Sequence, residues 1–264
     1  MRKLRVEFVT VNDPLYILPF FEEFFRHYRD EVDIVHVSLC RTMGKRSRKK
    51  LAQELMALYG PLGFFKLGAY TASSTVLGLL PKPADAPSYH SMRQLCRAYE
   101  VACSSITSAS AAEFVPLLKS RECDLLISVA CPFVLGREVL ATPPQGCINI
   151  HHAPLPKYRG MMPTFWQLYH GEKAVGLTIH AMTEKLDEGA IFYQSRIEVS
   201  PGESLHELIR RCKRQAAHCL AGVLRSVQSG ELKAVDPEDT TSSYFSFPTV
   251  ATIREFRKRG LRAI

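Results

Sequence analysis

The sequence lacks the short motifs that mark several common chemistries. It has no Cys-x-x-Cys among its eight cysteines, which argues against zinc-ribbon and dithiol redox patterns and favours buried free thiols. It has no G-x-G-x-x-G and no G-x-x-x-x-G-K-[ST], which disfavours a dinucleotide-dependent enzyme and a P-loop NTPase. The N-terminal apolar run is short and is interrupted by Glu7, so no signal peptide is predicted. Together these absences predict a cytoplasmic protein in a reducing compartment.

The sequence also lacks a hydrophobic run that is long enough and sufficiently free of charge to cross a membrane. The most apolar window, residues 61–80, contains Lys66 and several Ser and Thr residues. We favour packing of this window in the protein core. Docking of residues 41–80 on a membrane surface or on a protein partner is the alternative interpretation.

Acidic residues are scarce in two short stretches. Residues 41–50 carry six basic and no acidic groups, and residues 254–262 carry five basic groups and one Glu. These runs contribute +6 and +4 to the net charge of +8, which leaves −2 for the rest of the chain. A near-neutral body with two basic patches argues against a protein that coats nucleic acid and leaves room for local recognition of an anionic partner.

Expected strands and helices alternate along the first part of the chain. Short apolar and β-branched runs predict strands at four places, with helical patterns between them: 4–11, 32–39, 124–130 and 146–151. This alternation predicts an α/β fold with a doubly wound, mostly parallel sheet, in which ligands bind at the carboxyl ends of the strands. A further helix is predicted near 49–59, immediately before the apolar window.

The second part of the chain is predicted to add two strands and one long helix. The strands are expected at 176–182 and 190–198. Ser200 begins an S-x-x-E capping box, which predicts a helix that runs from there to Gly230. We expect residues 1–230 to form one domain with an insertion at about 41–90, and residues 231–264 to form a short C-terminal extension rather than a second domain.

A first candidate site lies where the strand at 146–151 meets a proline-rich loop. Asn149 and His151 are two residues apart, so they project from the same side of the strand. An amide can donate to a developing oxyanion, and an imidazole can transfer a proton. The alternative is that Asn149 caps the loop and His151 is a hydrogen-bonded core residue. Pro154 and Pro156 fix the shape of the loop and favour the functional interpretation.

A second candidate is the segment Thr183–Gly189, between two expected strands. Taken alone, its spacing favours an ordinary turn in which Asp187 and Gly189 supply the turn geometry. The interpretation changes when the two segments are taken together. Asn-x-His, followed by Leu-Pro-x-Tyr-Arg-Gly and then by Leu-Asp-x-Gly about forty residues later, resembles the 10-formyltetrahydrofolate-dependent formyltransferases. The resemblance spans roughly residues 122–230.

The resemblance implies a Rossmann-like formyltransferase fold and transfer of a formyl group from 10-formyltetrahydrofolate to an amine, without a metal. Asn149 and protonated His151 match the residues that would stabilise the oxyanion. Asp187 matches the aspartate that would orient His151 and relay a proton. By the same resemblance, the pterin of the folate would contact the turn around Asp187 and the backbone of Pro132, Phe133, Val134 and Leu135.

Two further histidines stand near these motifs. His180 matches a histidine found in several members of the family, and we expect it to support the catalytic residues rather than to react. His152 stands where the family usually has proline, and we expect it to be a loop residue rather than a substrate contact.

The acceptor is inferred by elimination. The sequence stops about 34 residues after the long helix, where the methionyl-tRNA enzyme carries another domain, which disfavours tRNA. It begins at the first strand, without the regulatory domain of formyltetrahydrofolate hydrolase. Residues 11–14 replace the glycine-rich loop of the glycinamide-ribonucleotide enzyme. A small amine remains, such as a sugar-linked or nucleotide-linked one.

Three alternatives stay open: a methionyl-tRNA formyltransferase-like enzyme without its C-terminal domain, a formyltetrahydrofolate hydrolase, and a non-catalytic protein that binds folate or a partner. The sequence does not indicate the oligomeric state.

Overall fold

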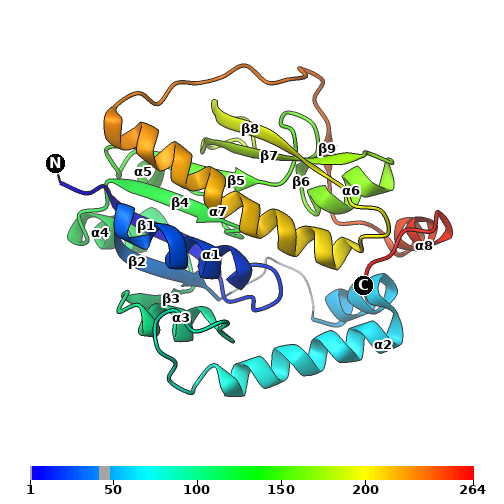
Figure 1. The fold of residues 1–264 in the computed structure, drawn as a ribbon. Coiled ribbons are helices and arrows are strands. Elements are labelled where there is room, and N and C mark those ends of the chain that lie inside the picture. Colours follow the sequence, from blue (N-terminus) through cyan, green and yellow to red (C-terminus); the bar gives the residue numbers. More distant parts are fainter. Residues whose placement is uncertain (1, 42–47) are drawn as a thin grey trace.

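The computed structural model describes residues 2–41 and 48–264, and within them seven strands form a central sheet (Figure 1). The spatial order is β3-β2-β1-β4-β5-β7-β8. Neighbouring strands from β3 to β5 pair in parallel, whereas β7 and β8 are antiparallel. The prediction of a doubly wound, mostly parallel α/β sheet is confirmed. The strands are β1 (Arg5–Val11), β2 (Asp33–Cys40), β3 (Cys103–Ile106), β4 (Leu125–Val129), β5 (Cys147–His151), β7 (Ala174–Ala181) and β8 (Ile191–Glu198).

One strand of the sheet, β3, was not predicted. It is four residues long and reads Cys-Ser-Ser-Ile, so it has neither the length nor the apolar pattern of a buried strand. Its place is set by pairing with β2 at the edge of the sheet rather than by its own sequence.

Two helices cover one face of the sheet and bury much of the core. Helix α1 (Leu18–Tyr28) and helix α7 (Leu205–Ser229) lie side by side across it (Figure 1). Four phenylalanines of α1 are fully buried, and the first three of them pack around Phe8 of β1: Phe20, Phe21, Phe24 and Phe25. Burying such side chains stabilises the fold by about 1.5–3 kcal/mol each. Five shorter helices are η1 (Arg29–Glu31), α3 (Met92–Ala98), α4 (Ala111–Ser120), α5 (Arg137–Leu140) and α6 (Pro163–Tyr169).

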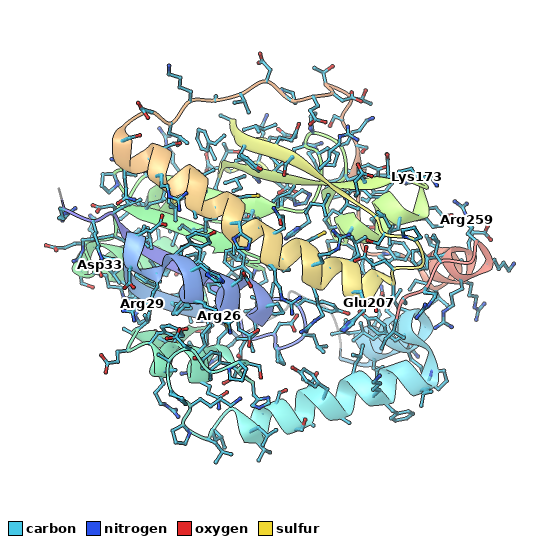
Figure 2. All side chains as sticks on the ribbon, viewed as in Figure 1. Arg26, Arg29, Asp33, Lys173, Glu207 and Arg259 are labelled. Atoms are coloured by element: carbon cyan, nitrogen blue, oxygen red, sulfur yellow. The ribbon has the colours of Figure 1, made fainter. Side chains whose placement is uncertain are left out.

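Helix α7 begins four residues later than the sequence predicts. Its N-cap is Ser204, whose hydroxyl accepts from the Glu207 amide while the Glu207 carboxylate accepts from the Ser204 amide. Figure 2 shows Glu207 at this end of the helix. Ser200 belongs instead to a turn in which Gly202 has a φ of +73°, which interrupts any helix. The predicted end at Gly230 is confirmed by its left-handed conformation.

The apolar window is helical, but only one of its sides, with Leu67, packs on the core, and most of its large apolar side chains are exposed, contrary to the prediction. Helix α2 (Arg48–Leu77) continues through a break at Gly60, and the part from Pro61 onward lies along one edge of the molecule (Figure 1). Leu62 is 84% exposed and Phe65 is 66% exposed. No helix in the described part of the chain combines the length and the apolar character needed to cross a bilayer. Residues 42–47, most of the first basic run, lie outside the described residues.

The C-terminal segment returns to the body of the molecule. After α7 it runs along β8, where the Val235 amide donates to the Ile191 carbonyl. Strand β9 (Tyr244–Phe245) then pairs with the short strand β6 (Arg159–Gly160), and helix α8 (Val250–Lys258) packs on α2. Phe256 of α8 is fully buried and stacks on Phe165 of α6.

Candidate active site

The sheet register brings the residues of the first motif together with β7. Asn149 and His151 lie at the carboxyl end of β5 and project from the same side, as the two-residue period predicts. Strand β7 runs antiparallel to β5 and places His180 directly opposite Asn149. His180 of β7 therefore joins Asn149 and His151 of β5 as a third polar residue.

The turn between β7 and β8 carries Asp187 to the same place. Asp187 has a φ of +54°, an uncommon conformation for a residue with a side chain. Two residues later, a Cβ on Gly189 would lie 1.8 Å from the carbonyl oxygen of Ala181, so only glycine lets the turn pack this closely on β7. This close packing turns the Asp187 carboxylate inward, where its residue is only 8% exposed.

Asp187 lies between the two histidines without touching either. Its Oδ1 is 3.7 Å from His151 Nδ1 and 3.8 Å from His180 Nε2. Its Oδ2 accepts a hydrogen bond of 2.9 Å from the Gly160 amide. The neighbouring residues Arg159 and Glu188 form an ion pair. The Arg-Gly of the loop motif and the Asp-Glu of the turn motif therefore hold each other in place.

The hydrogen bonds assign the ring nitrogens of both histidines. His151 Nε2 donates to the Tyr158 carbonyl at 2.9 Å, which leaves Nδ1 facing Asp187. His180 Nδ1 donates to the Ala181 carbonyl at 2.8 Å, so its Nε2 is free to accept from the Asn149 side-chain amide at 3.2 Å. Burial, and then the nearby charge of His151, lower the pKa of His180 to about 4. A neutral His180 therefore orients the Asn149 amide.

A cavity of about 500 Å³ opens beside this cluster. Asp187, Gly189 and Ile191 line it on the side of the turn, and Leu155 and Pro156 line it on the side of the loop. The C-terminal segment closes it with residues that include Val235, Pro237, Thr240 and Ser242. Sequence reasoning missed this contribution, because a segment rich in Asp, Pro, Glu, Thr and Ser resembles a solvated linker.

Comparison with known proteins identifies the family. The model of the formyl transferase family matches residues 71–224, which is more than half of the chain. The chain belongs to the formyl transferase family. Its motifs, recognised from the sequence as a resemblance, lie within the matched region.

Curated relatives of this formyl transferase include methionyl-tRNA formyltransferases. The protein from Kosmotoga olearia is 32% identical over 153 residues, which cover 58% of this chain and 49% of the relative. The protein from Syntrophus aciditrophicus is 37% identical over 131 residues, which cover 50% and 42%. The chain spans about half the length of these relatives.

Solved structures support the same fold for the formyl transferase. Glycinamide ribonucleotide transformylase 1 from Symbiobacterium toebii superposes with a TM-score of 0.61 at 17% identity, covering 89% of this chain and 95% of that one. A sugar N-formyltransferase from Shewanella sp. FDAARGOS_354 gives a TM-score of 0.56 at 18% identity, with 92% and 76% covered. At these identities the likeness concerns the fold.

The segment Pro132–Leu135 of this formyl transferase follows β4, the strand next to β5 in the sheet. Leu135 is buried and Val134 is 70% exposed. Asp187 lines the cavity, whereas this segment, Asn149 and His151 do not, so contact of the pterin with Pro132–Leu135 stays a prediction.

His152 lies in the loop after β5, as predicted, and its side chain is buried. Neither of its ring nitrogens has a hydrogen-bond partner within the described residues. Burial, with the nearby charges of Lys213 and His151, holds the pKa of His152 well below its usual range. Lys213, which the sequence did not single out, is also buried, and burial lowers its pKa to about 8 against the opposing attraction of Asp13. No group of metal-binding side chains is found among the described residues.

Proposed function

We propose that this formyl transferase moves a formyl group from 10-formyltetrahydrofolate to the amine of a small acceptor, with Asn149, His151 and Asp187 at the reacting centre. The observation that carries the proposal is the convergence of these three side chains from a strand and a distant turn, with His180 between Asn149 and Asp187. Of the three, Asp187 lines the cavity. Both His151 and Asp187 are less than a tenth exposed, so their charges act with little screening by water.

Attack of a neutral amine on the formyl carbon forms a C–N bond and places negative charge on the formyl oxygen. The Asn149 amide, held by His180, would donate one hydrogen bond to that oxygen. His151 would supply the second donor from Nδ1, because its Nε2 is already committed to the Tyr158 carbonyl. The 3.7 Å gap between Nδ1 and Asp187 leaves Nδ1 available to the substrate.

Collapse of the intermediate breaks the bond between the formyl carbon and N10 of the folate. The acceptor nitrogen loses a proton, and N10 gains one. Asp187 would orient His151, take the acceptor proton through water and pass it on to N10, so that the proton lost by the amine is the one that N10 gains. The folate is consumed in each cycle and is therefore a substrate, for which we propose the cavity beside Asp187 and the backbone of Pro132–Leu135.

The first loop supports an acceptor other than glycinamide ribonucleotide. Asp13 follows β1, and its Oδ1 accepts from the amides of Leu15 at 2.7 Å and Tyr16 at 3.2 Å. Backbone amides at such a position can bind a phosphate, but here the chain's own carboxylate occupies them. We propose an amino sugar or another small amine. Methionyl-tRNA is the second candidate, because relatives that act on it share 32–37% identity with this chain.

The test is a panel of acceptors. Purified protein is incubated with 10-formyltetrahydrofolate and with amino sugars, nucleotide-linked amino sugars, glycinamide ribonucleotide or methionyl-tRNA, and both tetrahydrofolate and formamide product are measured. We expect formylated product from a small amine. Asp187→Asn should reduce product formation by at least about a hundredfold, whereas Glu184→Gln, an exposed change in the same turn, should not.

Other outcomes contradict the proposal. Product only from methionyl-tRNA would establish the second candidate. Tetrahydrofolate released without any acceptor would indicate a hydrolase. Tight folate binding without turnover would indicate a binding protein.

A further inference from the structure

The exposed half of α2 carries a regular apolar stripe. Its members are separated alternately by three and four residues: Leu62, Phe65, Ala69, Ala72 and Val76, with Leu79 in the turn that follows. All six are exposed, and Leu62, Phe65, Val76 and Leu79 are each at least 66% exposed. A 3-4 spacing of apolar residues keeps one narrow face of a helix apolar, which is the pattern of a helix that pairs with another helix. We call these six residues the α2 seam.

The α2 seam points away from the rest of the molecule. The opposite side of the helix is the side that packs on the body, through Gly63, Leu67 and Ser74. A Cβ on Gly63 would lie 3.1 Å from a side-chain carbon of Ile264, which shows how closely this side is covered. Figure 2 shows side chains extending from the other side of the helix, at the outer edge of the fold. Within the described residues, no element covers the seam.

The order of side-chain sizes along the α2 seam is symmetric. Large residues stand at both ends, and Ala69 and Ala72 stand at the centre. If a second α2 lies antiparallel with the centre between Ala69 and Ala72, then Leu62 faces Leu79, Phe65 faces Val76, and Ala69 faces Ala72. Small central residues allow two helix backbones to approach closely, and the large residues then fill the space at each end.

The charged residue near the α2 seam causes little repulsion in the antiparallel arrangement. Lys66 is the charged residue that flanks the stripe, and in the antiparallel register it lies across from Thr75 of the other copy. The two copies of Lys66 are nine residues apart along the helix pair, about 13 Å at 1.5 Å per residue, which exceeds the screening length of about 8 Å in physiological salt. A parallel pair would instead bring the two lysines together.

We propose that the α2 seam is a self-association surface, on which α2 of a second copy of this chain packs antiparallel across a two-fold axis between Ala69 and Ala72. Such an interface uses the same residues from both copies, as two-fold symmetric dimers do. The inference concerns assembly and does not depend on the proposed reaction.

The first test is the oligomeric state, measured by analytical ultracentrifugation over a range of protein concentrations. The unaltered chain should dimerise. Phe65→Glu buries a charge opposite Val76 and should raise the dimer dissociation constant by at least about a hundredfold. Thr71→Glu, an exposed change on another face of the same helix, should leave the dimer intact.

The second test fixes the orientation. Chains that carry Ala69→Cys and chains that carry Ala72→Cys are mixed and oxidised, with the unaltered chain as the background for native thiols. Antiparallel pairing should give mainly the mixed crosslink. Crosslinks mainly between identical variants would indicate a parallel pair and overturn the proposed register.

Two results would overturn the proposal as a whole. One is a chain that stays monomeric at the highest soluble concentration. The other is a dimer that Phe65→Glu does not weaken. Cosedimentation of monomers with phosphatidylglycerol vesicles, lost in Phe65→Glu, would show that the seam binds a membrane surface instead.

Discussion

Two buried clusters of charged side chains occupy opposite ends of the same sheet. Near the amino end, Glu7 of β1 is completely buried, and its Oε1 accepts from Ser38 Oγ at 2.6 Å and from Arg121 Nη1 at 2.7 Å. At the carboxyl end, Asp187 stands 3.7 Å from His151 and 3.8 Å from His180. The groups of the first cluster are joined by short hydrogen bonds. In the second cluster the distances from Asp187 to the two histidines are slightly longer than a hydrogen bond.

This difference in distance suggests different roles: the first cluster stabilises the fold, and the second is proposed to take part in the reaction. A short, charge-assisted hydrogen bond fixes both partners and leaves neither available to a ligand. In the proposed reaction, the wider spacing around Asp187 would leave His151 Nδ1 for the substrate. Of the described residues in the two clusters, only Asp187 borders the 500 Å³ cavity. We therefore expect substitutions in the two clusters to have separable effects.

The largest expected effect is on the second cluster. His151→Gln can keep a donor to the Tyr158 carbonyl but loses the ring nitrogen Nδ1 that faces Asp187. We expect the rate of formyl transfer to fall about a thousandfold, while the free energy of unfolding changes by less than about 1 kcal/mol. Single-turnover kinetics and urea unfolding measure the two quantities. A rate within tenfold of the unaltered protein would remove His151 from the reacting centre.

In the first cluster we expect the opposite result, a loss of stability without a loss of the rate of transfer. Arg121→Met leaves the buried Glu7 carboxylate without its cation and should lower the free energy of unfolding by about 3 kcal/mol. The rate of transfer in the folded fraction should not change. The double variant Glu7→Leu/Arg121→Met removes both charges and should regain most of the stability. If Arg121→Met lowered the rate of transfer without lowering the stability, the two clusters would not have separate roles.

The last effect, on stability rather than on the rate of transfer, is a difference in response to acid. Burial lowers the pKa of His180 to about 4, so the unfolded chain takes up this proton near pH 6.5 and the folded protein does not. Stability should therefore fall between about pH 6.5 and 4, by up to about 1.4 kcal/mol per pH unit from this residue. Burial raises the pKa of Glu7, which gives the opposite sign. Urea unfolding across this range should show a shallower loss in His180→Gln; an unchanged slope would show that His180 does not stay neutral.

The strands of the sheet were predictable where the local pattern and the tertiary environment agree. Strands β1 and β2 were predicted to within about a residue because both are short runs rich in apolar and β-branched residues, as buried parallel strands are. Helix α7 was predicted with a wrong start, because two S-x-x-E sequences follow each other at 200–203 and 204–207, and the left-handed Gly202 excludes a helix that begins at the first. The exposure of α2 was not predictable, since hydrophobicity alone does not tell which surface a residue contacts.

The candidate site was predictable in part. The two-residue period placed Asn149 and His151 on one side of β5, but the approach of Asp187 was expected only from the family resemblance. The support that His180 gives to Asn149 depends on the register of two antiparallel strands, which no local pattern states. The closure of the cavity by the segment around Val235 requires the chain to return over the sheet, and this also leaves no local signal.

Contacts made by the last part of the described chain determine when earlier segments can complete their packing during synthesis. Arg257 donates to the Leu58 carbonyl at the break in α2, 199 residues earlier. The Leu205 and His206 amides at the start of α7 donate to the carbonyls of Arg262 and Ala263. At about 5–20 residues per second, α2 would wait roughly ten to forty seconds on the ribosome before Arg257 exists. During that interval the break in α2 lacks its cover, so the nascent chain exposes apolar surface to chaperones for longer than a fold of local contacts would.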